Sequence, residues 1–289
     1  MRDYIELTKP RIVALVMITA LAGVVAERSL LLEPLRLIVV LGAIMLTAGS
    51  ANAFNQYFER DLDAQMERTR ARRPLPRHRV PPGGALGFAI GIGVLSVIAL
   101  AMYGSPLAAW LAFGTIAFYG FFYTLWLKPR TVHNIVIGGA AGAMGPVIAW
   151  AAASGHLALA PVLMFLVIFL WTPPHFWALA ICVQDDYRRV QIPMLPIVKG
   201  EAETYRQIEL YTLVLVLVTL LMPFANAGGL VLGVTALFMG VAFVVKAFRA
   251  RRAPTVAAAR DVFAYSIVYL FVLFLGMIAD AIWRIPLRS

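Results

Sequence analysis

The chain has 289 residues, of which 61% are hydrophobic and 14% charged, and its formal net charge at pH 7 is +10. Its mean hydropathy of +0.82 excludes a soluble globular protein of this length, which would need far more polar surface. Because the apolar residues form long blocks, we expect the positive charge to orient the chain in a bilayer and not to bind nucleic acid.

Nine apolar segments predict an all-α polytopic membrane protein with a single integral-membrane domain over residues 1–289. Each segment is close to the roughly 20 residues that span a hydrocarbon core. Helices are expected because backbone polar groups in lipid must be paired within the chain. The segments run over residues 10–26, 37–59, 83–103, 106–127, 133–153, 157–183, 208–225, 228–248 and 262–284.

The basic residues are distributed unevenly between alternate connections. With the N-terminus in the cytoplasm, the outer side carries only Arg28, Arg36, Arg284 and Arg288, and the inner side carries all other Lys and Arg residues. The positive-inside rule then predicts an N-in, C-out topology. The N-terminus has the pattern of neither a cleavable signal peptide nor an Arg-rich transit sequence, so we expect a bacterial inner membrane. The lone Cys182 excludes a disulfide within the chain.

The second apolar segment ends in a polar run that repeats at every fourth residue. At about 100° per residue, Asn55, Glu59 and Asp63 lie on one helix face, whereas Asp61 points away. Carboxylate and amide oxygens suit a hard cation such as Mg²⁺, which typically joins one or two carboxylates to substrate phosphates. The alternative is a charged loop balanced by ion pairs. The neighbouring arginines suit an anion at the same place: Arg68, Arg70, Arg72 and Arg73.

A second polar constellation lies in and after the sixth segment. Pro173 and Pro174 remove backbone donors and are expected to bend the helix, and His175 follows them directly. If the helix continues, Asp186 lies about 16 Å further along the same face. Ionisable side chains inside a membrane are usually functional, although a hydrogen-bonded interior histidine is the alternative for His175. Lys199 follows where the chain re-enters the membrane.

These two polar sites are expected on one membrane face, and both open towards apolar helices. An amphiphile with a diphosphate head could bind by its head at the surface and by its tail in the bundle. The acidic residues of both sites belong to the connections that the topology assigns to the cytoplasm.

Several motifs resemble the UbiA superfamily of intramembrane prenyltransferases. Asn55, Glu59 and Asp63 resemble its Asn-x3-Asp-x3-Asp motif, with Glu59 in the middle position. The runs LTKPR (7–11), NIVIGGAAGAMGP (134–146), WTPPHFWALA (171–180) and DYRRVQIPMLPIVKG (186–200) resemble its haem branch, the protohaem IX farnesyltransferases. The superfamily often has a second Asp-x3-Asp motif, whereas Val190 stands four residues after Asp186.

The resemblance implies nine helices around a central cavity, and Mg²⁺, farnesyl diphosphate and haem b as ligands. The product would be haem O, with haem A synthase or terminal oxidase assembly as possible partners. It implies that Asn55, Glu59, Asp63 and Asp186 hold the metal and that His175 contacts the haem. The candidate diphosphate-binding residues are Arg68, Lys128, Arg130 and Lys199, and Tyr123 or Tyr187 could stabilise an allylic cation.

Three other functions compete with this interpretation. A related prenyltransferase could act on a quinone precursor or another ring acceptor, although the run around His175 disfavours it. An ion-coupled transporter would need acids near the membrane midplane, whereas the acids here cluster at one surface. A non-catalytic haem-handling assembly factor would explain His175 but leave the column from Asn55 to Asp63 without a role.

Overall fold

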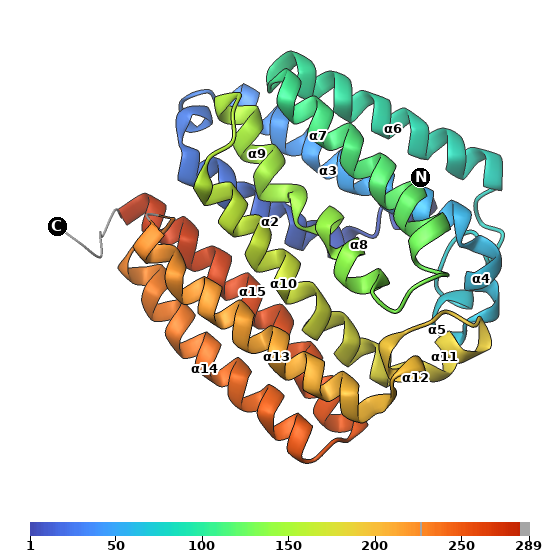
Figure 1. Ribbon diagram of the computed structural model, residues 1–289. Coiled ribbons are helices and arrows are strands. Elements are labelled where there is room, and N and C mark those ends of the chain that lie inside the picture. The colour runs from blue at the N-terminus through green and yellow to red at the C-terminus, as the bar shows by residue number, and fades with distance from the viewer. Residues whose placement is uncertain (226, 284–289) are drawn as a thin grey trace.

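The computed structural model describes residues 1–225 and 227–283, which form a bundle of helices (Figure 1). Within these ranges, nine spans are long and apolar enough to cross a membrane, as predicted. Arg284 and Arg288, which we predicted on the outer side, lie outside the described residues. The spans are α2 (Pro10–Glu27), α3 (Pro34–Phe58), α6 (Pro82–Tyr103), α7 (Pro106–Ala117) with η2 (Phe118–Leu127), α8 (Asn134–Gly142) with α9 (Met144–Ser154), α10 (Leu159–Cys182), α13 (Gly200–Leu221) with η3 (Met222–Ala225), α14 (Leu230–Arg252) and α15 (Val256–Trp283).

Short helices occupy the connections between the spans. Figure 1 shows four of them gathered at one end of the bundle, which we call the polar end, while the last turns of α15 lie at the other end. These four are α4 (Arg60–Gln65), α5 (Glu67–Arg70), α11 (Gln184–Arg189) and α12 (Leu195–Val198). The remaining two are α1 (Arg2–Leu7) and η1 (Ser29–Leu32). Both predicted polar constellations therefore lie at the same end, as the sequence indicated.

Two spans, α13 and α15, begin well before the apolar segments that predicted them. Helix α13 begins at Gly200 and not at residue 208, and α15 begins at Val256 and not at residue 262. Apolarity marks only the part of a helix that faces hydrocarbon, whereas α13 begins with polar residues that include Glu201 and Glu203. The first turns of such helices extend beyond the apolar stretch.

Helix α10 contacts α8, α9, α13 and α15 and lies in the middle of the bundle (Figure 1). It continues in helical conformation through Pro173 and Pro174, so the prolines do not break it. The condition under which Asp186 would share a helix face with His175, that the same helix continues, is not met. The helix ends at Cys182, Val183 leaves the helical region with φ −129° and ψ 29°, and Asp186 belongs to α11.

The outward surface of the spans is apolar, and several polar groups inside the bundle are paired with each other. Trp110 and Phe238 are each 71% exposed, as expected for side chains that face lipid. Inside, the hydroxyl groups of Thr47 and Ser96 lie 3.0 Å apart. The buried Asp280 carboxylate accepts hydrogen bonds from three backbone amides at the start of α14. Such pairing satisfies polar groups that water cannot reach, although the buried Nε1 atoms of Trp150 and Trp177 have no hydrogen-bond partner among the described residues.

Candidate active site

The predicted column of Asn55, Glu59 and Asp63 is formed where α3 passes into α4 at the polar end. Glu59 lies between α3 and α4, but helical hydrogen bonds continue across it. The Glu59 amide donates to the Asn55 carbonyl (3.0 Å), and the Asp63 amide donates to the Glu59 carbonyl (2.8 Å). The three side chains consequently point the same way, and all three are buried. Asp61 points out, with its side chain 81% exposed, as predicted.

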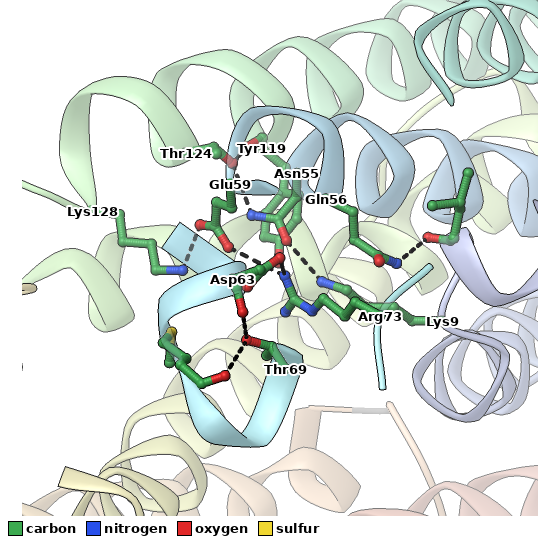
Figure 2. Close-up of polar contacts among 12 residues, drawn as sticks. Lys9, Asn55, Gln56, Glu59, Asp63, Thr69, Arg73, Tyr119, Thr124 and Lys128 are labelled. Atoms are coloured by element: carbon green, nitrogen blue, oxygen red, sulfur yellow. Dashed lines mark hydrogen bonds and ion pairs between the residues drawn. The ribbon is translucent and has the colours of Figure 1, made fainter. Parts of the chain in front are cut away.

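Three basic side chains from separate parts of the chain converge on this column (Figure 2). Lys128, directly after η2, donates to Glu59 Oε1 at 2.5 Å. Arg73 forms an ion pair with Asp63 and lies 3.7 Å from Glu59. Lys9, directly before α2, donates to Asn55 Oδ1 at 2.8 Å. We call Lys9, Asn55, Glu59, Asp63, Arg73 and Lys128 the charged cluster.

Burial and mutual attraction shift the pKa values within the charged cluster. Burial, together with the nearby Arg73 charge, lowers the pKa of Lys9 to about 7. Burial would raise the pKa of Glu59, but the charges of Lys128 and Arg73 outweigh it and hold that pKa below its ordinary value. Burial raises the pKa of Asp63, and the Glu59 charge adds to this against the effect of Arg73. The neighbouring cations therefore outweigh burial at Glu59 but not at Asp63.

Lys9 is aimed at the cluster by an unusual backbone. Its φ of 54° and ψ of 65° are left-handed, which is uncommon for a residue other than glycine, and Pro10 starts α2 immediately after it. Side chains of α3 anchor the preceding turn: Gln56 donates to the carbonyls of Glu6 and Leu7, and Asn52 donates to that of Thr8. Such a conformation costs energy and persists where its surroundings enforce it.

The aromatic wall beside the column is a π-helix. Residues Phe118–Leu127 follow this wider helix, and the Lys128 amide donates to the Tyr123 carbonyl, five residues earlier. Thr124 Oγ1 donates to the Tyr119 carbonyl (2.7 Å), and Asn55 Nδ2 donates to that hydroxyl (3.2 Å). The hydrogen bonds between residues five apart, which widen the helix, thus set the direction of both Thr124 and Lys128. Nothing in the residue pattern distinguishes this π-helix from an α-helix.

Asp186 has a different environment from the other predicted metal ligands. Its carboxylate is buried and accepts hydrogen bonds from the backbone amides of Glu67 (2.9 Å) and Arg68 (3.1 Å). Arg189 of the same helix forms an ion pair with Glu67 at 3.1 Å. These contacts join α11 to α5 and so connect the segment after α10 with the segment after α3 at the polar end. They also leave Asp186 outside the charged cluster.

The other predicted diphosphate residues differ in their positions. The Arg68 Nε atom is buried and has no hydrogen-bond partner within the described part of the chain. Arg130 is exposed, donates to the carbonyls of Leu125 and Trp126 and covers the Trp126 ring. Lys199 is exposed at the start of α13. Lys128 alone of the four joins the charged cluster. Arg73, one of the four arginines that we expected to suit an anion there, also joins it, as does Lys9, which was not among our predicted site residues.

His175 lies between α10 and α15, where it stacks between Trp171 and Phe263 at centroid distances of 4.2 and 4.7 Å. Its Nδ1 atom is 2.7 Å from the Ser266 hydroxyl, which donates its one hydrogen to the Phe263 carbonyl (2.6 Å). The hydroxyl must therefore accept from His175, so the neutral ring carries its proton on Nδ1. This tautomer leaves a lone pair on Nε2, the atom that could bind a metal or accept a proton.

An apolar cavity of about 110 Å³ adjoins the charged cluster. It is bounded by α2, α3, α7 with η2, and α8 with α9. Asn52 and Tyr119 lie where it meets the polar end, and Ile44 and Ile148 lie further along α3 and α9. The cavity thus approaches the charged cluster at Asn52 and Tyr119, although none of the cluster's own residues lines it.

The donor set of the charged cluster fits Mg²⁺ in complex with a phosphate. It offers two carboxylates and an amide oxygen, all hard ligands, and Mg²⁺ usually keeps waters or phosphate oxygens in its other positions. Over residues 1–225 and 227–283, no three His, Cys, Asp or Glu side chains gather into a complete protein cage. The three cations of the cluster suit the phosphate that would complete the coordination.

Sequence comparisons relate the chain to known prenyltransferases. The profile of the UbiA prenyltransferase family matches residues 16–278. The protohaem IX farnesyltransferase of Gloeobacter violaceus is 46% identical over 285 residues, which cover 98% of this chain and 93% of that protein. The protohaem IX farnesyltransferase of a Nostoc species is 44% identical over 283 residues, covering 97% and 89%.

Solved structures share the fold at low sequence identity. A digeranylgeranylglyceryl phosphate synthase matches with a TM-score of 0.80 and 16% identity, over 97% of this chain and 98% of that one. A UbiA homologue from Aeropyrum pernix K1 matches with a TM-score of 0.70 and 15% identity, over 94% and 98%. A homologue from Archaeoglobus fulgidus, bound to GPP and Mg²⁺, matches with a TM-score of 0.64 and 12% identity, over 95% and 99%. These likenesses establish the arrangement of the helices.

Proposed function

The chain belongs to the UbiA prenyltransferase family, and on that premise we propose that it transfers a farnesyl group from farnesyl diphosphate to a vinyl group of haem b. The product is haem O, and diphosphate is released. Relatives with the name protohaem IX farnesyltransferase, matched over nearly the whole chain, support this acceptor. The observation that carries the proposal is the charged cluster close to an apolar cavity, because a prenyl diphosphate needs both environments near each other.

Asn55, Glu59 and Asp63 would hold Mg²⁺, which when bound neutralises charge on the diphosphate. Lys9, Arg73 and Lys128 balance these side chains in the present structure and would turn to phosphate oxygens as the diphosphate enters. Arg68, whose buried Nε has no partner among the described residues, is a further donor for the same anion. Asp186 would complete the metal site only by leaving the amides of Glu67 and Arg68. Arg130 and Lys199 do not contact the cluster and have no role in this proposal.

The reaction breaks the allylic C–O bond, and the diphosphate leaves with both electrons. The basic residues of the cluster stabilise the charge that develops on it, an effect that is strong in a buried site. The vinyl π electrons of the haem then form the new C–C bond. Water adds its oxygen to the resulting cation and loses a proton, which gives a hydroxyethylfarnesyl group. The burial of the charged cluster within the bundle would keep other water away from the allylic cation until it has reacted.

The haem subsite is proposed at His175, through Nε2 as an iron ligand or as the partner of a propionate. Ser266→Ala removes the group that holds the Nδ1 proton and the ring orientation. We expect haem affinity to fall by roughly 10- to 100-fold, the usual range for loss of an outer-shell partner of a histidine ligand. His175→Ala should lose at least as much. Haem titration followed by absorbance measures both, and the Soret band should shift if the ring ligates iron.

Binding of farnesyl diphosphate provides the control for this prediction. It should change little in either variant, because the charged cluster shares no hydrogen bond with His175 or Ser266. Normal haem affinity and an unchanged spectrum in His175→Ala would make the histidine a packing residue between Trp171 and Phe263.

The multi-pass arrangement in the membrane follows from the nine spans and the family, and we propose that the polar end faces the cytoplasm. Reporter fusions after residues 75, 129, 195 and 255 should then give cytoplasmic signals. Fusions after residues 104 and 155, in the connections after α6 and α9, should report the opposite side. The physical reason is the excess of Lys and Arg in the first set of connections. A periplasmic signal from any of the first four fusions would contradict the orientation.

A further inference from the structure

The wall of the apolar cavity contains two glycines, Gly142 and Gly145, and only at Gly142 would an added Cβ meet no other atom within 4 Å. The run NIVIGGAAGAMGP supplies the wall from α8 and α9, with Ala141, Gly142, Met144 and Gly145 at the cavity. This wall lies opposite α3, whose residues from Ile44 to Asn52 line the other side. In the proposed function, on which this inference rests, the cavity receives the prenyl chain.

Close packing explains three of the glycines in this run. A Cβ on Gly138 would collide with the Tyr123 ring, and one on Gly139 would lie 2.9 Å from Thr172 Cβ. A Cβ on Gly145 would lie 3.0 Å from Thr19 Oγ1. Tyr123, Thr172 and Thr19 belong to η2, α10 and α2, so these glycines let neighbouring helices approach α8 and α9.

Gly142 is different, because neither packing nor backbone geometry requires a glycine there. A Cβ at this position would meet no atom within 4 Å. The residue is the last of α8, and it is not among the glycines with positive φ in the described part of the chain, so an L side chain fits its backbone. Glycine is also a poorer helix former than alanine. Gly142 is an exposed residue that lines the cavity, so the remaining consequence of a glycine there is open space at the cavity wall.

The size of that space matches a small piece of prenyl chain. An apolar cavity of about 150 Å³ admits benzene, with six carbons, so 110 Å³ corresponds to about one five-carbon isoprene unit. We propose that Gly142 is a specificity-determining residue: by leaving this volume free, it lets the cavity accept the last isoprene unit of a farnesyl chain, whose first two units would lie between the charged cluster and the cavity. A leucine at 142 adds four carbons and would fill that volume.

The test is equilibrium binding of radiolabelled geranyl and farnesyl diphosphate, with Mg²⁺ and without haem, to the purified full-length protein. We expect Gly142→Leu to weaken farnesyl diphosphate binding at least about tenfold, because roughly one isoprene unit loses its buried surface. Geranyl diphosphate should keep its affinity within about twofold, since its head contacts are untouched. Gly142→Ala, the milder variant, should weaken farnesyl diphosphate binding in the same direction but less.

Gly91→Leu is the matched control. Gly91 lies in α6, is exposed on the lipid-facing surface and does not line the cavity, and a Cβ added to it would have no atom within 4 Å. The substitution should leave both affinities unchanged. Equal weakening of geranyl and farnesyl diphosphate binding by Gly142→Leu, or no weakening by either Gly142 variant, would overturn the assignment of Gly142.

Failure of the proposed function would look different. If the wild-type protein binds farnesyl diphosphate with the expected dependence on Gly142 but forms no prenylated haem, the acceptor is wrong and the role of Gly142 stands. If it binds no prenyl diphosphate in the presence of Mg²⁺, both proposals are wrong.

Discussion

Asp63→Asn is expected to lower prenyl transfer by roughly 10²- to 10³-fold, the size of effect seen when one group that stabilises transition-state charge is lost. The substitution preserves the shape of the side chain and an oxygen that can accept from Arg73, but it removes a negative charge from the proposed metal site. Arg73 keeps Glu59 as a partner at 3.7 Å, so its charge is not left without compensation. Rates are to be measured with farnesyl diphosphate and haem b at saturating Mg²⁺.

Asp61→Asn is the matched control for this variant. Asp61 is two residues away in the same short helix, and its side chain is 81% exposed. Its substitution should change the rate by less than about twofold, because exposed ion pairs contribute little. Thermal unfolding in one detergent should give similar midpoints for both variants and the wild type. Near-normal turnover in a folded Asp63→Asn protein would remove Asp63 from the reaction.

Lys128→Met is expected to lower kcat/KM for farnesyl diphosphate by about 100-fold. Methionine keeps the length of the side chain but removes the cation that contacts Glu59 Oε1 at 2.5 Å and that we assign to the departing diphosphate. The loss should appear in kcat as well as in KM, because negative charge on the diphosphate grows as the C–O bond lengthens. Steady-state kinetics with varied farnesyl diphosphate would separate the two parameters.

Lys246→Met is the matched control, because it removes a lysine that forms an ion pair outside the site. Lys246 Nζ is 2.7 Å from Asp261 Oδ2 and its side chain is 31% exposed, but it lies between α14 and α15. Its removal should leave kcat/KM within about twofold of wild type, as for other partly exposed ion pairs. An equal loss in both variants would indicate a general effect of net charge, not a contact of Lys128 with substrate.

The sequence predicted the spans and the column of Asn55, Glu59 and Asp63 because both depend on local regularities. Apolar length identifies helices in a bilayer, and a four-residue repeat places side chains on one helix face. The interpretation of Asp186 also used local reasoning, but it depended on the helix of His175 continuing. That helix ends at Cys182, with Val183 outside the helical region. The acid instead joins two connections that are more than a hundred residues apart in the chain.

The remaining site residues depend on contacts between distant segments. Lys9 contacts Asn55, 46 residues away in the chain, because its backbone is left-handed, and no pattern in the sequence predicts that conformation. The one sequence feature that could have pointed to Lys9 is its position in LTKPR, a run that resembles the family. Lys128 reaches Glu59 because η2 is a π-helix, and a shift of one residue in that helix would turn the lysine away. Arg73 was one of four neighbouring arginines, and only the folded turn distinguishes it.

The most direct test of the central proposal is to incubate the purified protein with haem b, Mg²⁺ and farnesyl diphosphate and to analyse the haem by mass spectrometry. We expect a product whose mass equals haem b plus one farnesyl group and one hydroxyl, formed with release of diphosphate and lost on addition of EDTA. A quinone precursor offered in place of haem should remain unmodified. Unchanged haem b together with a prenylated quinone precursor would contradict the proposed acceptor, and product that forms equally well in EDTA would contradict the metal–diphosphate site.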